Sequence, residues 1–586
     1  MCTSLMTWLP ELSTRAATFS GTAIWHSHIR LDLAVVIMVV GRMNSGTSSS
    51  ISRGAILCWF VLALLVLMVS CASPPAPAPE EQFGPPQSSI DLAQAARYAL
   101  RAFLAGQEDD DYLRDWIAAL QMVALDSHPK AYKLLVELTS SDRFSALSPE
   151  RRHAGLLLTG LLGLEQRDNS YSHRILVRAS EMPEAGVADW EGRYTGASRV
   201  LDALDAMKSL TLLANRWPSE LGRLRPYPLQ DLVLRKPDDE VQKAARFDLL
   251  NALFDASWRP FEGTEPQQEW LLLVDECVAR NDLTRAARVV TRIDDPHSLL
   301  GLRVDRRDDA LVRLRPASFD LTAAGTRQVA EYLRSVNDYP RSLDAVVQLT
   351  YVYLGLGRYS DVITVTNDVI ERVTLSGDVK KIFDDGPDSL EWIYDNRARA
   401  LAALGRDEEA EPELRSAAER LEGGEKNVNN ALNLANFLLD RGRPEEARSV
   451  LSELPKDPDD FSPYGKMVHH AVLVEAALML KDTDASEQAL IYLKQHEQDA
   501  PQVLQRALLR AGETDEAAAV LIRSLEDPST RRRALVAIQD YAPHKQPARV
   551  KAYNRQFDLW LQRPDIQAEI AKVGRRETVA LPAELK

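Results

Sequence analysis

LAALGRDEEA (Leu401–Ala410), LLDRGRPEEA (Leu438–Ala447) and LLRAGETDEA (Leu508–Ala517) are three versions of one pattern in the C-terminal half of the chain. In each, an apolar helical run ends at a glycine, a short polar turn follows, and an alanine begins the packed face of the next helix. The three glycines are separated by 37 and 70 residues. Such spacing predicts an array of helix pairs, in which each pair buries its apolar face against its neighbours.

A fourth copy, YVYLGLGRYSDV (Tyr351–Val362), has Gly357 in the same place, and Thr374–Leu390 is interpreted as an insertion before the next copy. The copies resemble the tetratricopeptide repeat (TPR), a helix pair of about 34 residues with a turn between its helices. The positions that carry the resemblance are Leu349, Tyr353 and Tyr359; Tyr394, Ala398, Leu401, Ala410, Leu414 and Ala417; Leu434, Ala435, Leu438, Ala447 and Leu451; and Leu504, Leu508, Ala517, Leu521 and Pro528. The resemblance implies an all-α fold: a TPR-like helical-repeat solenoid, that is, a superhelical array of antiparallel helix pairs.

The repeat pattern is weaker outside these copies. Lys466–His496 is interpreted as a helix pair whose turn comes from Asp482–Asp484 instead of glycine, and Trp270–Val290 fits the spacing with Asn281 at the turn. Asparagine tolerates the left-handed backbone that a tight turn needs. We expect an N-terminal helical region over 90–260, TPR-like helices over 261–340, the TPR array over 341–530, and C-terminal capping helices with a tail over 531–586.

The N-terminal part contains a targeting signal. Ala55–Ser70 is an uncharged apolar run of 16 residues that follows Arg53 and precedes Cys71. This length is short for a membrane span and typical of a signal peptide. The tetrad Met68–Cys71 resembles a bacterial lipobox, which implies a lipoprotein signal peptide over 43–70 and lipidation of Cys71; an uncleaved single-pass anchor is the alternative. Residues 1–42 do not fit a signal peptide and are interpreted as a mis-assigned N-terminal extension.

The segment after the lipobox indicates how the helical part of the chain would be attached to a membrane. Residues 71–89 are rich in proline, and such a tether stays extended and holds the body away from a membrane. Position 72 is alanine and not aspartate. By resemblance to enterobacterial lipoproteins, this favours the outer membrane. We therefore expect a lipid-anchored protein of the cell envelope that faces the periplasm.

Charge and motif content argue against several classes of function. The net charge is −15, so nucleic acid is not an expected partner, because phosphate binding needs a concentrated basic surface. Nucleophile-elbow, phosphate-loop and dinucleotide motifs do not occur in the sequence, and we expect neither catalysis nor a cofactor. His469 and His470 with Glu475 lack the spacing of metal ligands on a helix. Cys277 falls at a buried repeat position, where a thiol is inert.

The resemblance also indicates where a ligand would bind. In TPR proteins the first helix of each pair lines a concave groove. The corresponding candidate peptide-binding residues are Tyr351, Asp395, Arg399, Asn429, Asn436, Arg506 and Arg510. The combination of Arg, Asn and Arg loosely resembles the carboxylate clamp of chaperone-associated TPRs, although lysine is missing from these positions, and ordinary solvated polar residues are the alternative. A functional groove of this kind would select an acidic or C-terminal segment through charge-assisted bonds from arginine.

Two classes of function remain open from the sequence. The first is a scaffold or assembly factor that binds a partner protein or peptide in its groove. The second is an enzyme or enzyme subunit with a site in the N-terminal helical region Ile90–Pro260. Polar residues that converge in a closed pocket there would favour the enzyme, whereas polar residues along an open surface would favour the scaffold.

Overall fold

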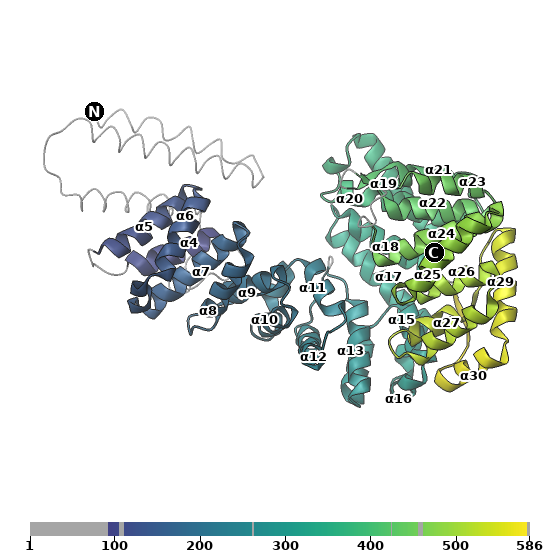
Figure 1. Cartoon of the computed structure of the whole chain (residues 1–586), viewed down its shortest axis with the longest axis horizontal. Coiled ribbons are helices and arrows are strands. Elements are labelled where there is room, and N and C mark those ends of the chain that lie inside the picture. The colour runs from purple at the N-terminus through teal and green to yellow at the C-terminus, as the bar shows by residue number, and fades with distance from the viewer. Residues whose placement is uncertain (1–91, 105–109, 261–262, 423–424, 455–460, 583–586) are drawn as a thin grey trace. The chain divides into compact units, whose positions relative to one another are not determined.

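The structure, a computed structural model, describes residues 92–582 apart from 105–109, 261–262, 423–424 and 455–460. These residues are helical almost throughout (Figure 1). Strands occur among them as two short pairs: β1 (Leu421–Glu422) lies antiparallel to β2 (Glu425–Lys426), and β3 (Asp540–Ala542) lies parallel to β4 (Thr578–Pro582). The prediction of an all-α helical-repeat solenoid is confirmed. The signal peptide, Cys71 and the tether lie outside the described residues.

Successive helix pairs form the array that the glycine pattern predicts. The pairs are α18 (Leu343–Gly355) with α19 (Tyr359–Ser376), α20 (Gly386–Ala403) with α21 (Asp407–Glu419), α22 (Val428–Asp440) with α23 (Pro444–Ser452), α24 (Pro463–Leu480) with α25 (Thr483–Gln495), and α26 (Pro501–Ala511) with α27 (Thr514–Glu526). The first helices of successive pairs pack together, α18 on α20, α22 on α24 and α24 on α26. Ala410, Ala447 and Ala517 are completely buried, and their small size lets the second helix of each pair approach the first.

The turn inside each pair has one backbone geometry. Gly357, Gly405, Gly442 and Gly512 all have φ between 71° and 84°, the left-handed region that glycine enters at little cost. The pair α24–α25 has Lys481 at this position with φ 60°, and the neighbouring Asp482 caps α25 by accepting a hydrogen bond from the backbone N–H of Ala485. The stretch Lys466–His496 is therefore a repeat of the same kind.

The N-terminal helical region has the same turns without glycine. Its helices are α4 (Leu92–Leu104), α5 (Asp111–Ala124), α6 (His128–Ser140), α7 (Pro149–Glu165), α8 (Asn169–Ser180), α9 (Val187–Arg199), α10 (Ala203–Arg216), α11 (Pro226–Leu234) and α12 (Glu240–Asp255). Positive φ occurs after α5, α7, α9 and α12, at Asp126, Arg167, Leu201 and Ser257. The antiparallel contacts α7–α8 and α9–α10 are as extensive as those inside the array. Helix pairs thus run through most of the described chain.

Between these two regions lie five further helices. They are α13 (Gln267–Ala279), α14 (Leu283–Val289), α15 (Pro296–Val304), α16 (Asp309–Leu314) and α17 (Leu321–Asp338), with the 3₁₀ turn η5 (Arg306–Asp308) before α16. Asn281 stands between α13 and α14 with φ 58°, so the predicted asparagine turn is confirmed. Trp270 and Cys277 of α13 are completely buried.

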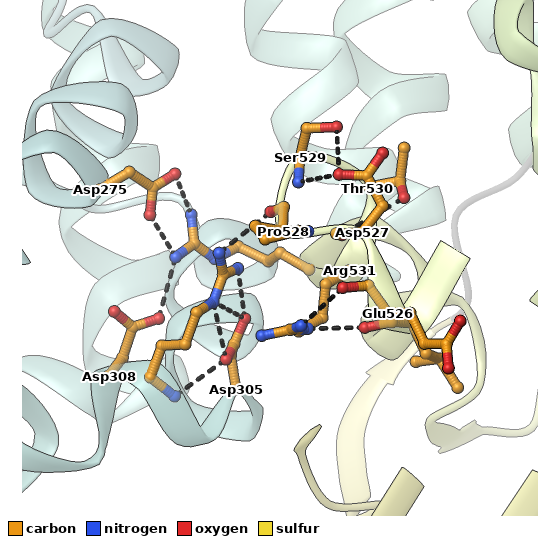
Figure 2. Close-up of polar contacts among 12 residues, drawn as sticks. Asp275, Asp305, Asp308, Glu526, Asp527, Pro528, Ser529, Thr530 and Arg531 are labelled. Atoms are coloured by element: carbon orange, nitrogen blue, oxygen red, sulfur yellow. Dashed lines mark hydrogen bonds and ion pairs between the residues drawn. The ribbon is translucent and has the colours of Figure 1, made fainter. Parts of the chain in front are cut away.

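The C-terminal segment packs against the helices between the two regions. It contains α28 (Arg531–Ala537), β3, α29 (Ala548–Leu561), α30 (Pro564–Val573) and β4. Helix α28 packs on α15, and α30 packs on α27. Figure 2 shows Asp275, Asp305 and Asp308 facing the chain around Glu526–Arg531. One hydrophobic core therefore contains residues from α13–α16 together with residues from α26–α30.

Within the described residues, no helix combines the length and the apolar character that crossing a membrane would need.

Candidate binding surface

Five side chains occupy the same register position on successive first helices. Each stands six residues before the left-handed turn residue of its pair: Tyr351, Arg399, Asn436, Glu475 and Arg506. We call these residues the first-helix row. Because the pairs repeat one geometry, equivalent positions lie along one face of the array. Four members were predicted from the sequence. The fifth, Glu475, was missed as part of this surface because Lys481 replaces the glycine that sets the register.

The first end of the row is a hydrogen-bonded group. Arg399 Nε lies 2.8 Å from Asp395 Oδ2, and Asn433 Nδ2 donates to Asp395 Oδ1 at 3.0 Å. The sequence placed Asp395 among the exposed positions, but the structure buries its side chain completely. Asp395 therefore positions Arg399 and links α20 to α22. Burial, together with the charge of Asp395, raises the pKa of the half-buried Tyr351 hydroxyl beside this pair.

The middle of the row and the start of the same helix present amides. Asn429 is exposed at the start of α22 and Asn436 is half-buried two turns later. Within the described part of the chain neither amide has a hydrogen-bond partner. Each amide offers one acceptor and two donors, so this stretch can pair with the main chain of an extended segment.

The last end of the row contains charges of both signs. Arg510 Nη2 lies 3.5 Å from Glu475 Oε1, and Arg506 is half-buried on the same helix. Burial and the charge of Glu475 raise the pKa of the Asp440 carboxyl to about 6, although Arg510, Arg441 and Arg506 oppose the shift. The carboxylates of Asp440 and Glu475 therefore offset much of the positive charge that the sequence pattern placed here.

The C-terminal segment covers part of this end. Arg549 Nη2 of α29 lies 2.8 Å from Glu475 Oε1, and the guanidinium carbon of Arg510 lies 4.1 Å from the ring centroid of Tyr553. Arg506 and Arg510, the two arginines predicted for this end, both lie on α26. Arg510 is already stacked on the ring of Tyr553 in the same chain.

The histidines and the cysteine considered in the sequence lie in packed surroundings. His470 stacks on Tyr492 at 3.8 Å between ring centroids, and Tyr492 stacks on His496 at 4.1 Å. Burial, with the neighbouring histidines, lowers the pKa of His470 to about 4, so the ring is neutral at pH 7. Burial raises the pKa of the Cys277 thiol to about 11, which keeps it protonated. The described residues contain no group of three or more His, Cys, Asp or Glu side chains that could hold a metal ion.

The N-terminal region contains one constellation of catalytic residue types. His153 Nε2 lies 2.8 Å from Asp189 Oδ1, and His153 Nδ1 lies 3.1 Å from the hydroxyl of Tyr98. His153 and Asp189 are both completely buried. Asp189 Oδ2 also accepts a hydrogen bond from the backbone N–H of Gly186, which caps α9. The group ties α4, α7 and α9 together, and a substrate cannot reach its nitrogens or oxygens without opening these helices.

The similarity of this chain to known proteins is low both in sequence and in structure. No family model matches the sequence. No curated protein matches it either. Among solved structures it is similar to the APC/C hetero-tetramer Cut9–Hcn1, at 13% identity over 82% of this chain and 93% of that chain, with a TM-score of 0.25. It is also similar to the TPR domain of P58(IPK), at 14% identity over 71% of this chain and 100% of that chain, with a TM-score of 0.18. A third similar structure is yeast Tom70, at 11% identity over 82% of this chain and 96% of that chain, with a TM-score of 0.24. Similarity at this level carries no information about function.

Proposed function

We propose that the protein is a lipid-anchored scaffold or assembly factor of the cell envelope, and that it binds an extended segment of a partner protein along the first-helix row. The observation that supports this proposal is the alignment of Arg399, Asn436 and Arg506 at one register position on separate helices. A rigid row of donors on successive helices suits a peptide main chain and its carboxylates.

The proposed partner segment is acidic or ends in a free carboxylate. The unpartnered amides of Asn429 and Asn436 would pair with its backbone, and the guanidinium group of Arg506 would pair with a carboxylate. Repeat pairs bury their apolar faces against each other, so the surface left for a partner is polar and extended. Anchoring at Cys71 and the tether would hold this surface at the membrane, where the partner is met.

The test is recovery of partners from crosslinked envelopes of the native host. The double variant Asn436→Ala with Arg506→Ala removes one amide and one cation from the row. Both side chains are partly exposed, and Arg510 and Arg441 remain beside Asp440 when Arg506 is removed, so the melting temperature should change little. We expect quantitative mass spectrometry to show the loss of one or a few proteins that wild type recovers.

The matched control removes one amide and one guanidinium group from the second helix of a pair. Asn367 and Arg372 are on the surface of α19, which is the second helix of its pair and is not part of the first-helix row; the Arg372 side chain is 44% exposed. Asn367→Ala with Arg372→Ala should recover the same proteins as wild type. Equal recovery by the row variant and by the control would refute the proposal and place the partner surface elsewhere.

A further inference from the structure

Helix α29 contacts the last end of the first-helix row through polar groups. Arg549 reaches Glu475 Oε1 with Nε at 3.1 Å and with Nη2 at 2.8 Å. One helical turn later, the ring of Tyr553 lies under the guanidinium group of Arg510 at 4.1 Å. The side chains of Glu475 and Arg510 are each 14% exposed with α29 in place. An arginine and an aromatic residue four positions apart on one helix therefore occupy this site.

The body of α29 contributes two partly buried rings, Tyr553 and Phe557, to the hydrophobic core. Its buried residues are Trp560 and Leu561 in the last turn, and none of the residues from Ala548 to Leu559 is buried. By contrast, α26 buries five residues and α27 buries five. The two ends of the segment are well held, by the pairing of β3 with β4 and by the packing of α30 on α27. Between these ends, two partly exposed ion pairs hold the helix, Arg549 with Glu475 and Arg576 with Asp558. The cation–π contact of Tyr553 and the partly buried ring of Phe557 add to them. Each of these contacts is weak compared with a fully buried apolar face.

The charges at the site define what can replace α29. Its body carries Arg549, Lys551 and Arg555 against Asp558, so it is basic. It contacts the carboxylate of Glu475 and the face of the Arg510 guanidinium, and the Asp440 carboxyl lies near enough to both of these groups to feel their charges. A segment that replaces α29 needs a cation for Glu475 and an aromatic ring for Arg510.

We infer that α29 is an internal ligand of the first-helix row, and that a partner helix with an arginine and, four residues later, an aromatic residue binds at Glu475 and Arg510 by displacing it. This inference rests on the proposed function for the role of the row in partner binding. It adds a second binding element beside the donors of the row: Arg399, Asn436 and Arg506 take the acidic segment, and the pair Glu475–Arg510 takes a basic, aromatic helix.

The probe is a fluorescent synthetic peptide with the sequence of residues 546–561, added to the detergent-solubilised full chain. In wild type the internal α29 competes with it. The double variant Arg549→Ala with Tyr553→Ala removes both internal contacts and should bind the peptide at least about tenfold more tightly, because the competent state is no longer occupied. A peptide that carries the same two substitutions should lose its binding to this variant.

Lys551→Ala with Arg555→Ala is the matched control, since it removes two cations from exposed positions of the same helix. It should bind the peptide as wild type does. Equal affinity of wild type and the Arg549/Tyr553 variant, or no binding by either, would overturn the inference. A second measurement needs no variant: backbone amides of Ala548–Leu559 should exchange hydrogen faster than those of α26 and α27. Equal protection of the three helices would also overturn it.

The peptide experiment and the partner experiment can fail separately. Peptide exchange without any effect of the Asn436/Arg506 variant would refute the proposed function and leave α29 as a displaceable helix. Loss of partner by that variant without peptide exchange would support the proposed function and make α29 a fixed part of the fold.

Discussion

Arg532 and Asp275 lie 257 residues apart in the chain and form a direct ion pair, with Arg532 Nη1 2.7 Å from Asp275 Oδ2. The same guanidinium group donates to Asp308 Oδ2 at 2.9 Å, and the Asp308 side chain is only 1% exposed. Close by, Arg307 donates to the backbone carbonyl of Pro528 at 3.0 Å (Figure 2). Helix α28 is therefore held against α13 and η5 by charge as well as by its apolar contact with α15.

Replacement of Arg532 should destabilise this junction. Arg532→Ala would leave Asp308 buried without its cation, and we expect a loss of about 3 kcal/mol in the free energy of unfolding. Chemical denaturation of the detergent-solubilised chain measures it. Arg533→Ala is the control, because Arg533 is exposed on the same helix and should change stability little. If the two variants melt alike, the junction is not a stability element.

The sequence predicted the array well because its signal is local. A glycine that must adopt positive φ, with apolar residues before it and an alanine after it, is visible within ten residues, as at Leu438–Ala447. The junction of Arg532 with Asp275 was not predicted, because no spacing in the sequence encodes a contact across 257 residues. The covering of Arg510 by Tyr553 was missed for the same reason. The surface was predicted by register alone, and register does not show that Asp395 is buried.

The N-terminal repeats were missed because their turn residues are not glycine. Leu201 stands in the left-handed region with φ 62° and its side chain is 78% exposed. A leucine there is strained and buries nothing, so the sequence contains no sign of a turn. Arg167 after α7 and Asp126 after α5 also have positive φ at a turn without glycine.

This reading of Leu201 predicts a stabilising substitution. Leu201→Gly should raise the free energy of unfolding by about 1 kcal/mol, because glycine adopts positive φ without the clash of a Cβ atom. Leu125 is the matched control, since it is exposed at the end of α5 but has φ −98°. Leu125→Gly should be neutral or destabilising. A Leu201→Gly protein that melts below wild type would contradict the turn geometry.

The converse change is expected at Gly442. A Cβ atom built there meets no heavy atom within 4 Å, so only the backbone conformation with φ 76° opposes alanine. Gly442→Ala should cost about 1 kcal/mol in the free energy of unfolding. A Cβ atom at Gly222 also meets no neighbour, and Gly222 does not have positive φ. Gly222→Ala should therefore leave the melting temperature unchanged or slightly raised, and equal losses at the two sites would refute the argument.

The raised pKa of Asp440 makes stability depend on pH. Its pKa in the folded chain is about 6, against an ordinary value of 3.8, so the fold favours the uncharged carboxyl. The stabilising contribution is fully present below about pH 4 and is lost as the pH rises through 6. Wild type should therefore lose stability between pH 4 and pH 7, whereas Asp440→Asn should not. Over this range the free energy of unfolding of the variant should rise relative to that of wild type by on the order of 1–3 kcal/mol. Thermal melts of both proteins at several pH values measure the difference, and a difference that stays constant or reverses would contradict the prediction.

Lipidation of Cys71 stays a prediction, and it has a direct test. The apolar run that ends in Ser70-Cys71 implies that the Cys71 sulfur carries the lipid and that the new N-terminus begins there. In the native host, Cys71→Ser should abolish labelling with radioactive palmitate and leave a longer precursor on a gel. Cys58→Ser is the control, because Cys58 lies inside the same apolar run and should be removed with the signal peptide. Labelling that survives Cys71→Ser would show that the chain is held at the membrane in another way, with an uncleaved anchor over Ala55–Ser70 as the first alternative.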